Sequence, residues 1–344
     1  MIRESLLYLS DNRLAQNFVA EAPLARRIAE RFVAGESLAD AMRIAKALNA
    51  SGLTATLAHL GESVSHKGDA EVATDVTVRL LEAIAAEGIL ANVSLKPTQL
   101  GLSIDENLCL ANLRRVLTRA RELGDGDGEI FVRIDMESSE FAERTISLVT
   151  TLWAEGFRNV GTVIQSYLRR APIDLDRLIS LGSRVRLVKG AYRESRRIAY
   201  PDKADVDRMF VEEMQTLLEA NRYAAIATHD EAMIAATRRY AFERGIPRNS
   251  FEFQMLYGIR RDLQRRLREE GYNVRTYLPF GESWYPYLMR RMAERPANLL
   301  FVMGNVAKEA PTQGIATPIA LGSGFAFGAL ATAVWRGRDR ARSS

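Results

Sequence analysis

The chain reads Ile130-Phe-Val-Arg-Ile-Asp135 at one short apolar run and Val160-Gly-Thr-Val-Ile-Gln165 at the next. Between them lies Glu140–Ala154, in which apolar residues recur at helical spacing. Two β-branched runs separated by an amphipathic helix are typical of a parallel βαβ unit. Each run also ends on a polar residue, Asp135 or Gln165, which the apolar pattern itself does not require.

The same unit repeats along most of the chain. The apolar runs are Leu53–Leu60, Asn92–Leu95, Ile130–Asp135, Val160–Gln165, Val185–Lys189, Ala224–Thr228, Phe251–Met255 and Val274–Leu278. Amphipathic segments such as Val72–Ala86, Leu108–Leu123 and Val206–Ala220 separate them. Eight such units over roughly 250 residues predict a closed (β/α)8, TIM-type barrel. The alternative, an open doubly wound sheet, needs a Gly-rich phosphate loop after its first strand, and Leu60-Gly-Glu-Ser63 lacks that pattern.

Three segments are expected along the chain. Residues 1–48 form a helical N-terminal arm, residues 49–312 the barrel, and residues 313–344 an apolar extension that ends in arginines. The 47 basic and 43 acidic residues give a net charge of +4, and much of the excess lies in this arginine-rich end. The remainder is nearly neutral, so no nucleic-acid-binding surface is expected.

The single cysteine and the histidines indicate neither a disulfide nor a metal site. Cys109 has no partner for an intramolecular disulfide, and its apolar helical surroundings favour a buried small hydrophobic residue. His59, His66 and His229 are scattered and form no ligand set with it, so no metal is expected. No secretory signal is visible, and we expect a cytoplasmic protein.

Polar residues end nearly every apolar run, where a barrel places its active site. They are His59, Glu62, Lys96, Asp135, Gln165, Ser166, Lys189, Tyr192, Thr228, His229, Glu252, Gln254 and Tyr277. Helix capping explains only a few polar residues nearby, such as Asp230 and Ser283. The set as a whole predicts an active site at this end of the barrel.

A helical pattern after Gly281 carries Arg290 and Arg291, with Glu294 four residues after the first arginine. Two adjacent guanidinium groups suit a small carboxylate held by charge-assisted hydrogen bonds. A solvated basic helix face with an Arg–Glu pair is the alternative.

The motifs at the strand ends resemble those of the proline dehydrogenase family. They are Val93-Ser-Leu-Lys96, Val132-Arg-Ile-Asp135, Val163-Ile-Gln165, Arg186-Leu-Val-Lys189-Gly190-Ala191-Tyr192, Ala227-Thr228-His229, Glu252-Phe-Gln-Met-Leu256-Tyr-Gly258 and the Tyr277…Arg290-Arg291…Glu294 stretch. The resemblance covers about residues 50 to 300, and the chain is similar in length to the single-function bacterial form. It implies an FAD-dependent enzyme that oxidises L-proline to Δ1-pyrroline-5-carboxylate and passes the electrons to a quinone.

The resemblance also implies roles for the substrate-binding residues. Arg290 and Arg291 would hold the proline carboxylate from a last helix that lies over the barrel mouth, and Lys96 would add a third positive charge. The residues expected around the pyrrolidine ring are Tyr192, Leu256, Tyr277 and Tyr287. Plain core packing is the alternative for these four. In the family, an aromatic residue at the Tyr277 position accompanies preference for proline over hydroxyproline.

Two residues are implied to be catalytic, and a further set is implied to hold the cofactor. Asp135, among several cations, would organise the site and would be a poor general base. Arg186 would lie near the flavin N5 atom, and Lys189, Gly190 and Ala191 would follow the pyrophosphate. The remaining cofactor-binding residues implied are Met136, Gln165, Thr228, His229 and Glu294.

The uncharged run Ile315–Trp335 is 21 residues long and is followed at once by arginines. A run above about 18 apolar residues is a candidate for a membrane span. Pro318 and several glycines favour instead a segment that packs on the protein or contacts the membrane surface. All three interpretations stay open, as does assembly into a homo-oligomer.

Two other functions are compatible with a barrel of this kind. Lys189 ends a strand, as the lysine of a Schiff-base aldolase would, but that reaction leaves the arginine pair unexplained. A non-catalytic barrel that binds an amino acid is the second alternative. The presence of Asp135, Arg186 and Lys189 together disfavours it.

Overall fold

The computed structural model describes residues 29–61, 63–124, 128–220 and 222–294. The chain divides into two compact units, Ala29–Trp284 and a second made of residues 1–28 and 285–344. The barrel belongs to the first unit. Of the expected arm over residues 1–48, residues 1–28 lie outside the described residues, and so does the whole extension 313–344. The boundaries of both segments stay predictions.

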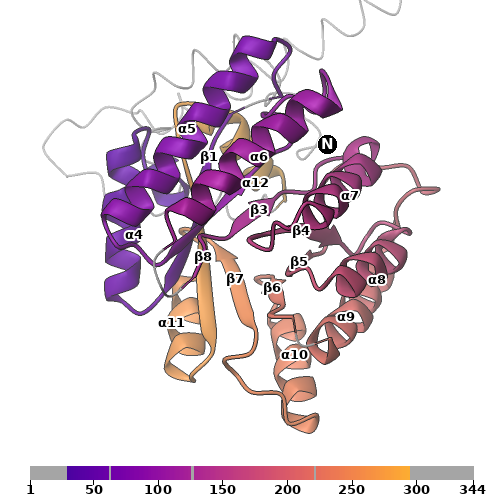
Figure 1. Ribbon diagram of the computed structural model, residues 1–344. Helices are drawn as coiled ribbons and strands as arrows, with labels where there is room; N and C mark the ends of the chain where they lie inside the picture. Colours follow the sequence, from indigo (N-terminus) through magenta and orange to yellow (C-terminus); the bar gives the residue numbers. More distant parts are fainter. Residues whose placement is uncertain (1–28, 62, 125–127, 221, 295–344) are drawn as a thin grey trace, which may run out of the picture. The chain divides into compact units, whose positions relative to one another are not determined.

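Eight parallel strands close into one barrel in sequence order (Figure 1). They are β1 (Thr54–His59), β2 (Ala91–Leu95), β3 (Val132–Ile134), β4 (Val160–Gln165), β5 (Val185–Val188), β6 (Ala225–Ala227), β7 (Glu252–Leu256) and β8 (Asn273–Phe280). Closure is made where β1 pairs with both β2 and β8, so that Thr56 lies opposite Asn92 on one side and Tyr277 on the other. The predicted (β/α)8 barrel is therefore confirmed.

A helix follows each strand in the sequence, and α4 precedes β1 (Figure 1). They are α4 (Leu38–Ala50), α5 (Lys67–Ala86), α6 (Glu106–Glu122), α7 (Ser139–Ala154), α8 (Ala171–Leu181), α9 (Lys203–Glu219), α10 (Glu231–Glu243), α11 (Arg261–Glu269) and α12 (Trp284–Glu294). Each buries one face: in α6 the buried side chains include Cys109, Leu113, Val116 and Leu117, at helical spacing. Cys109 is the buried hydrophobic residue that the sequence predicts, and burial raises the pKa of its thiol to about 12.

The segment before α4 packs on the carboxyl end of the barrel. Ala34 donates its backbone N–H to the carbonyl of Pro279, and Gly281 donates to the carbonyl of Gly35. Gly258 lies against the same segment: a Cβ there would come within 1.8 Å of the Arg31 carbonyl oxygen, and its φ is +77°. Only glycine fits that position without displacing the backbone.

The barrel interior carries polar side chains as well as apolar ones. Arg186 on β5 bonds to Ser94 on β2 and to Gln254 on β7, strands that are not its neighbours. Such bonds cross the inside of the barrel. Side chains two residues apart on a strand share a face, so Arg133 and Asp135 both point inward from β3 and its end.

Among the described residues, no helix has the length and apolar composition that a membrane span requires. The apolar run 315–335 lies outside them.

Candidate active site

Asp135 occupies the centre of a buried cluster at the carboxyl ends of the strands. Its Oδ1 accepts hydrogen bonds from Ser94 Oγ at 2.6 Å and from Arg186 Nη1 at 2.8 Å. Its Oδ2 accepts a bond from the Tyr277 hydroxyl at 3.2 Å, and Lys96 Nζ lies 3.7 Å from the same oxygen. The cluster brings together residues from β2, β3, β5 and β8, four of the predicted strand ends.

The surroundings of Asp135 keep it ionised. Burial by itself raises the pKa of this carboxyl group, but the positive charges of Arg186 and Lys96 and the bonds from Ser94 and Tyr277 outweigh burial. The resulting pKa lies below the usual 3.8. An acid with so low a pKa is a weak base at neutral pH. The organising role of Asp135 stays a prediction.

Arg186 has a fixed orientation and one nitrogen left for another partner. Its Nε donates to Gln254 Oε1 at 2.6 Å, and its Nη1 donates to Ser94 Oγ at 3.2 Å and to Asp135. Its guanidinium lies over the Tyr277 ring, 5.3 Å from the centroid. The Nη2 atom is buried and has no hydrogen-bond partner among the described residues. A buried donor of this kind costs free energy unless another group accepts from it.

The other expected substrate residues differ in how closely they approach this cluster. Lys96 and Tyr277 contact Asp135 directly. Leu256 ends β7, half-buried, and Tyr192 lies on the loop after β5 with 38% of its surface exposed. Tyr287 lies in α12, within the second unit.

The side chains of Arg290, Arg291 and Glu294 lie outside the described residues. Their backbone belongs to α12, so the predicted helix after Gly281 is present. The expected position of this helix over the barrel mouth stays a prediction.

The residues expected to bind a cofactor flank the cluster from β3 to β6. Met136 is buried after β3, and Gln165 at the end of β4 donates from Nε2 to the Glu137 carbonyl at 2.8 Å. Thr228 accepts from the Asp230 backbone N–H at 3.1 Å. His229 accepts from the Leu256 N–H through Nε2 at 2.9 Å, so Nε2 carries no proton and Nδ1 does.

Lys189 is held by two carboxylates. Its Nζ bonds to Asp207 on α9 at 2.5 Å and to Asp230 at 2.7 Å, and Lys203 pairs with both acids as well. Burial raises the pKa values of Asp207 and Asp230, but hydrogen bonds and charge from Lys189 and Lys203 lower them overall. The family resemblance implies that Lys189 follows the cofactor pyrophosphate, and the sequence did not reveal these two carboxylate partners.

Two features require glycine at position 190: its positive φ angle and the close approach of the Tyr167 ring. Its φ is +106°, and a Cβ would come within 2.1 Å of the Tyr167 ring. The sequence suggested a glycine for close approach to a ligand. The structure adds that the ring of Tyr167 already fills the space where a side chain would begin. The exposed Ala191 follows it on the same loop.

Sequence reasoning placed Glu252 and Gln254 among the strand-end polar residues but gave them no individual role, and it did not single out Ser94. All three lie inside the barrel and join the cluster or support it. The signal was their spacing: Ser94 lies two residues before Lys96, and Gln254 two residues before Leu256, on the same face of each strand. Among the described residues, no group of acidic, histidine and cysteine side chains has an arrangement that would hold a metal ion.

The family model for proline dehydrogenase matches residues 41–303. The chain belongs to the proline dehydrogenase family. It is 41% identical over 309 residues to proline dehydrogenase 1 of Bacillus subtilis strain 168, covering 90% of this chain and 100% of that protein. It is 43% identical over 302 residues to the proline dehydrogenase of Deinococcus radiodurans, covering 84% and 96%.

Two longer proteins match over part of their length. The bifunctional protein PutA of Escherichia coli is 28% identical, with 80% of this chain aligned to 24% of that protein. The crystal structure of proline utilization A from Bdellovibrio bacteriovorus, inactivated by N-propargylglycine, superposes with a TM-score of 0.74 at 27% identity. It covers 83% of this chain and 34% of that one. The family predicted from the strand-end motifs is thus confirmed.

Proposed function

We propose that this chain oxidises L-proline to Δ1-pyrroline-5-carboxylate, with FAD as hydride acceptor and a quinone as the final electron acceptor. The observation that carries the proposal is the Asp135–Arg186 pair, in which Arg186 Nη2 is buried and has no acceptor among the described residues. That donor lies in a chain whose relatives are proline dehydrogenases.

A flavin fits the residues at this end of the barrel. A buried guanidinium donor stabilises negative charge, which a flavin gains at N1 and its carbonyl oxygens on reduction, and it also suits an acceptor nitrogen such as N5. Bound FAD would supply the redox chemistry by accepting two electrons and one proton as hydride. Met136, Gln165, Lys189, Gly190, Ala191, Thr228, His229 and Glu294 would hold it.

The chain's own residues would orient the substrate. In the proposed reaction the proline Cδ–H bond gives a hydride to FAD and the N–H bond releases a proton, which leaves a double bond between Cδ and nitrogen. Lys96, Arg290 and Arg291 would bind the substrate carboxylate, and Tyr192, Leu256, Tyr277 and Tyr287 would enclose the ring. Orientation of this kind is a large contribution, because the C–H bond must point at the acceptor.

Asp135 would fix the two cations around it. Its carboxylate holds Arg186 Nη1 at 2.8 Å and lies 3.7 Å from Lys96 Nζ. The lowered pKa keeps the carboxylate charged through the neutral range, so Arg186 and Lys96 keep their counter-charge during turnover. Without it, two like charges would face each other in a buried site.

The contacts of Lys189 disfavour the Schiff-base aldolase. A Schiff base forms from a neutral, accessible amine. Lys189 Nζ instead bonds to Asp207 and Asp230 at 2.5 and 2.7 Å, an arrangement that suits the charged ammonium.

The test is the absorbance spectrum of the purified protein, recorded without oxygen before and after L-proline is added. We expect flavin bands that bleach with proline and change little with hydroxyproline at the same concentration. Bands that persist would contradict proline as the substrate, and a protein that stays colourless after incubation with FAD would contradict the cofactor. Reoxidation of the bleached protein by a soluble quinone tests the electron acceptor separately.

A further inference from the structure

Gln254 links the Arg186 side chain to a second polar cluster deeper in the barrel. It lies on β7, is 3% exposed, and points to the same face as Glu252 two residues earlier. Its Oε1 accepts from Arg186 Nε at 2.6 Å, and its Nε2 donates to Glu252 Oε1 at 2.5 Å. Both ends of the amide are therefore in use.

The amide can face only one way. Arg186 carries donors alone, and an ionised Glu252 carries acceptors alone. Turning the amide over would place its NH2 group against Arg186 and its oxygen against the Glu252 carboxylate. Gln254 is thus the residue type that joins a buried cation to a buried anion with a hydrogen bond on each side.

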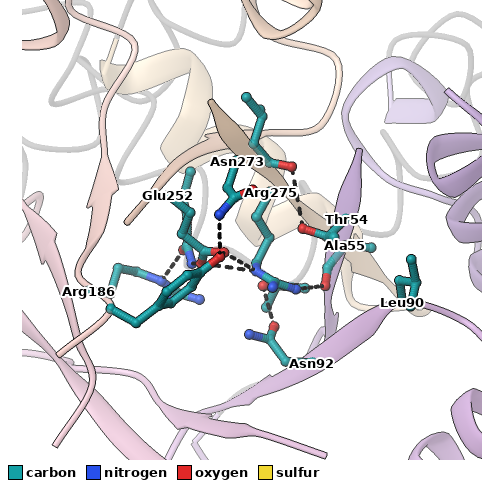
Figure 2. A network of polar contacts seen from close by, with 12 residues as sticks. Thr54, Ala55, Leu90, Asn92, Arg186, Glu252, Asn273 and Arg275 are labelled. Atoms are coloured by element: carbon teal, nitrogen blue, oxygen red, sulfur yellow. Dashed lines mark hydrogen bonds and ion pairs between the residues drawn. The ribbon is translucent and has the colours of Figure 1, made fainter. Parts of the chain in front are cut away.

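Glu252 is itself held firmly (Figure 2). Arg275 Nε lies 3.0 and 2.9 Å from its two carboxylate oxygens, and Arg275 Nη1 donates to the Ala55 carbonyl on β1 at 2.8 Å. The Tyr223 hydroxyl lies 3.4 Å from Glu252 Oε2, and Asn273 Nδ2 donates to that hydroxyl at 3.0 Å. This lower cluster connects β1, β7 and β8, so Gln254 is attached to a fixed support.

The attachment determines where the remaining Arg186 nitrogen points. A guanidinium group is planar and rigid, so fixing Nε and Nη1 also fixes Nη2. Asp135 and Ser94 hold Nη1, whereas Gln254 accepts the hydrogen bond from Nε. Without the Gln254 oxygen, the Arg186 guanidinium group can rotate about its contact with Asp135.

We propose that Gln254 is a positioning residue that aims Arg186 Nη2 at the bound cofactor, with Glu252 and Arg275 as its support. The inference rests on the proposed function for what Arg186 contacts. The hydrogen bonds that carry it join side chains of this chain to one another.

Two substitutions separate positioning from packing. Gln254→Leu keeps most of the volume and removes both hydrogen bonds. Gln254→Glu keeps them only when the new carboxyl is protonated, because a C=O would then accept from Arg186 and an O–H would donate to Glu252. Besides Arg186, the charged groups nearby are Asp135, Glu252, Arg275 and the buried Arg133.

Asn112→Leu is the matched control. Asn112 is a buried amide on α6 that donates to the Leu100 carbonyl at 3.0 Å, and it has no bond to the Arg186 cluster. Asn112→Leu removes a buried amide hydrogen bond and leaves the hydrogen bond between Gln254 and Arg186 in place. A general loss of stability would therefore lower flavin content similarly in both leucine variants.

We expect Gln254→Leu to slow flavin reduction by proline roughly 10- to 100-fold, the range for losing the buried hydrogen bond that Gln254 makes to the charged Arg186. The flavin midpoint potential should also shift in Gln254→Leu. Asn112→Leu should keep the rate within about twofold of native and leave the potential unchanged. For Gln254→Glu, the rate of flavin reduction relative to the native protein should fall as pH rises. The introduced carboxyl group then ionises, and the two carboxylates at positions 254 and 252 face each other without a hydrogen bond.

A readout that needs neither proline nor flavin completes the test. The Arg186 Nε–H resonance in the purified full chain should lose its protection from solvent exchange in Gln254→Leu and keep it in Asn112→Leu. Unchanged protection would overturn the inference, and so would equal changes in the rate and the potential in the two leucine variants. Because the resonance is read without substrate, failure of the native protein to react with proline would be a separate result.

Discussion

Arg186 and Asp135 form the ion pair around which the carboxyl end of the barrel is arranged, with Arg186 Nη1 2.8 Å from Asp135 Oδ1. The two side chains are 6% and 15% exposed, so water screens the pair little. Breaking such a pair from one side leaves a buried charge without its partner, which costs more than the pair itself contributes.

Replacing Asp135 by asparagine should therefore slow flavin reduction by proline by about 100-fold or more. The rate is measured by stopped-flow absorbance without oxygen. The control is Asp174→Asn on α8, where Arg170 Nε lies 2.6 Å from Asp174 Oδ2 in a pair away from the cluster. A comparable loss in Asp174→Asn would assign the effect to folding and contradict the role given to Asp135.

The lowered pKa of Asp135 gives this comparison a pH signature. A carboxyl group whose pKa is lower in the folded protein stabilises the fold at a pH above its unfolded value, and that contribution disappears only as pH falls through the folded pKa. Asp135 stays ionised from about pH 5 upward. The ratio of native to Asp135→Asn rates should be constant between about pH 5 and 9, and an inflection near neutral pH would contradict this assignment.

The strand pattern was readable from the sequence because barrel strands bury nearly all their residues. Val160–Gln165 appears in the structure with the same bounds, and every residue of it is buried. Short strands such as β6, with three residues, were recognised because an apolar run and a polar end lie together. Their bounds moved by one or two residues, since the last pairing depends on the neighbouring strand.

The contacts within the site could not be read from the sequence in the same way. Arg186 and Gln254 are 68 positions apart, and only the closed barrel brings β5 and β7 around a common interior. The pairing of Lys189 with Asp207 depends equally on where α9 begins. The sequence shows which polar residue ends each strand. Which side chains that residue contacts depends on the register of the strands and on how the helices pack against them.

Glu213 on α9 makes the stability of the fold depend on pH. Burial raises the pKa of its carboxyl from 4.5 to about 7, against a smaller lowering by the Ser166 hydroxyl. The folded protein then binds this proton more tightly than the unfolded chain does. The contribution of Glu213 to stability is therefore greatest below about pH 4.5, falls as pH rises toward 7, and levels off above that value.

Glu213→Gln should remove on the order of 3 kcal/mol of this pH dependence. The measurement is the free energy of unfolding in urea at several values between pH 4.5 and 8. The control Glu219→Gln, an exposed position on the same helix, should retain the native slope. If Glu213→Gln and the native protein show parallel curves, another group is responsible.

Gly190→Ala should destabilise the loop after β5 by more than its backbone angle alone explains. The added Cβ would clash with the Tyr167 ring at 2.1 Å, in a residue with φ +106°. Gly156→Ala is the control, because its φ is +90° and no atom of the described residues lies within 4 Å of the added carbon. Relative to that control, Gly190→Ala should lose a further 1–3 kcal/mol, roughly the cost of overpacking. Equal unfolding free energies for the two variants would show that Tyr167 moves aside freely.

Glu194 ties the same loop to the beginning of α7. Its carboxylate accepts from the Ser139 backbone N–H at 2.8 Å and from the Ser139 hydroxyl at 2.6 Å. A carboxylate at a helix N-terminus satisfies a free N–H group and interacts favourably with the helix dipole. The loop between Gly190 and Glu194, which carries Tyr192, is therefore fixed at both ends.

Glu194→Ala should cost about 1 kcal/mol in the free energy of unfolding, as for the loss of a helix cap. It should also speed backbone hydrogen exchange over residues 190–194 and the dissociation of FAD, because the loop loses its second attachment. Glu155→Ala removes the paired contact with Arg114 near the other end of α7 and should change stability without changing loop exchange. Faster exchange and FAD release in both variants would mean that α7 as a whole holds the loop and that Glu194 has no particular part in it.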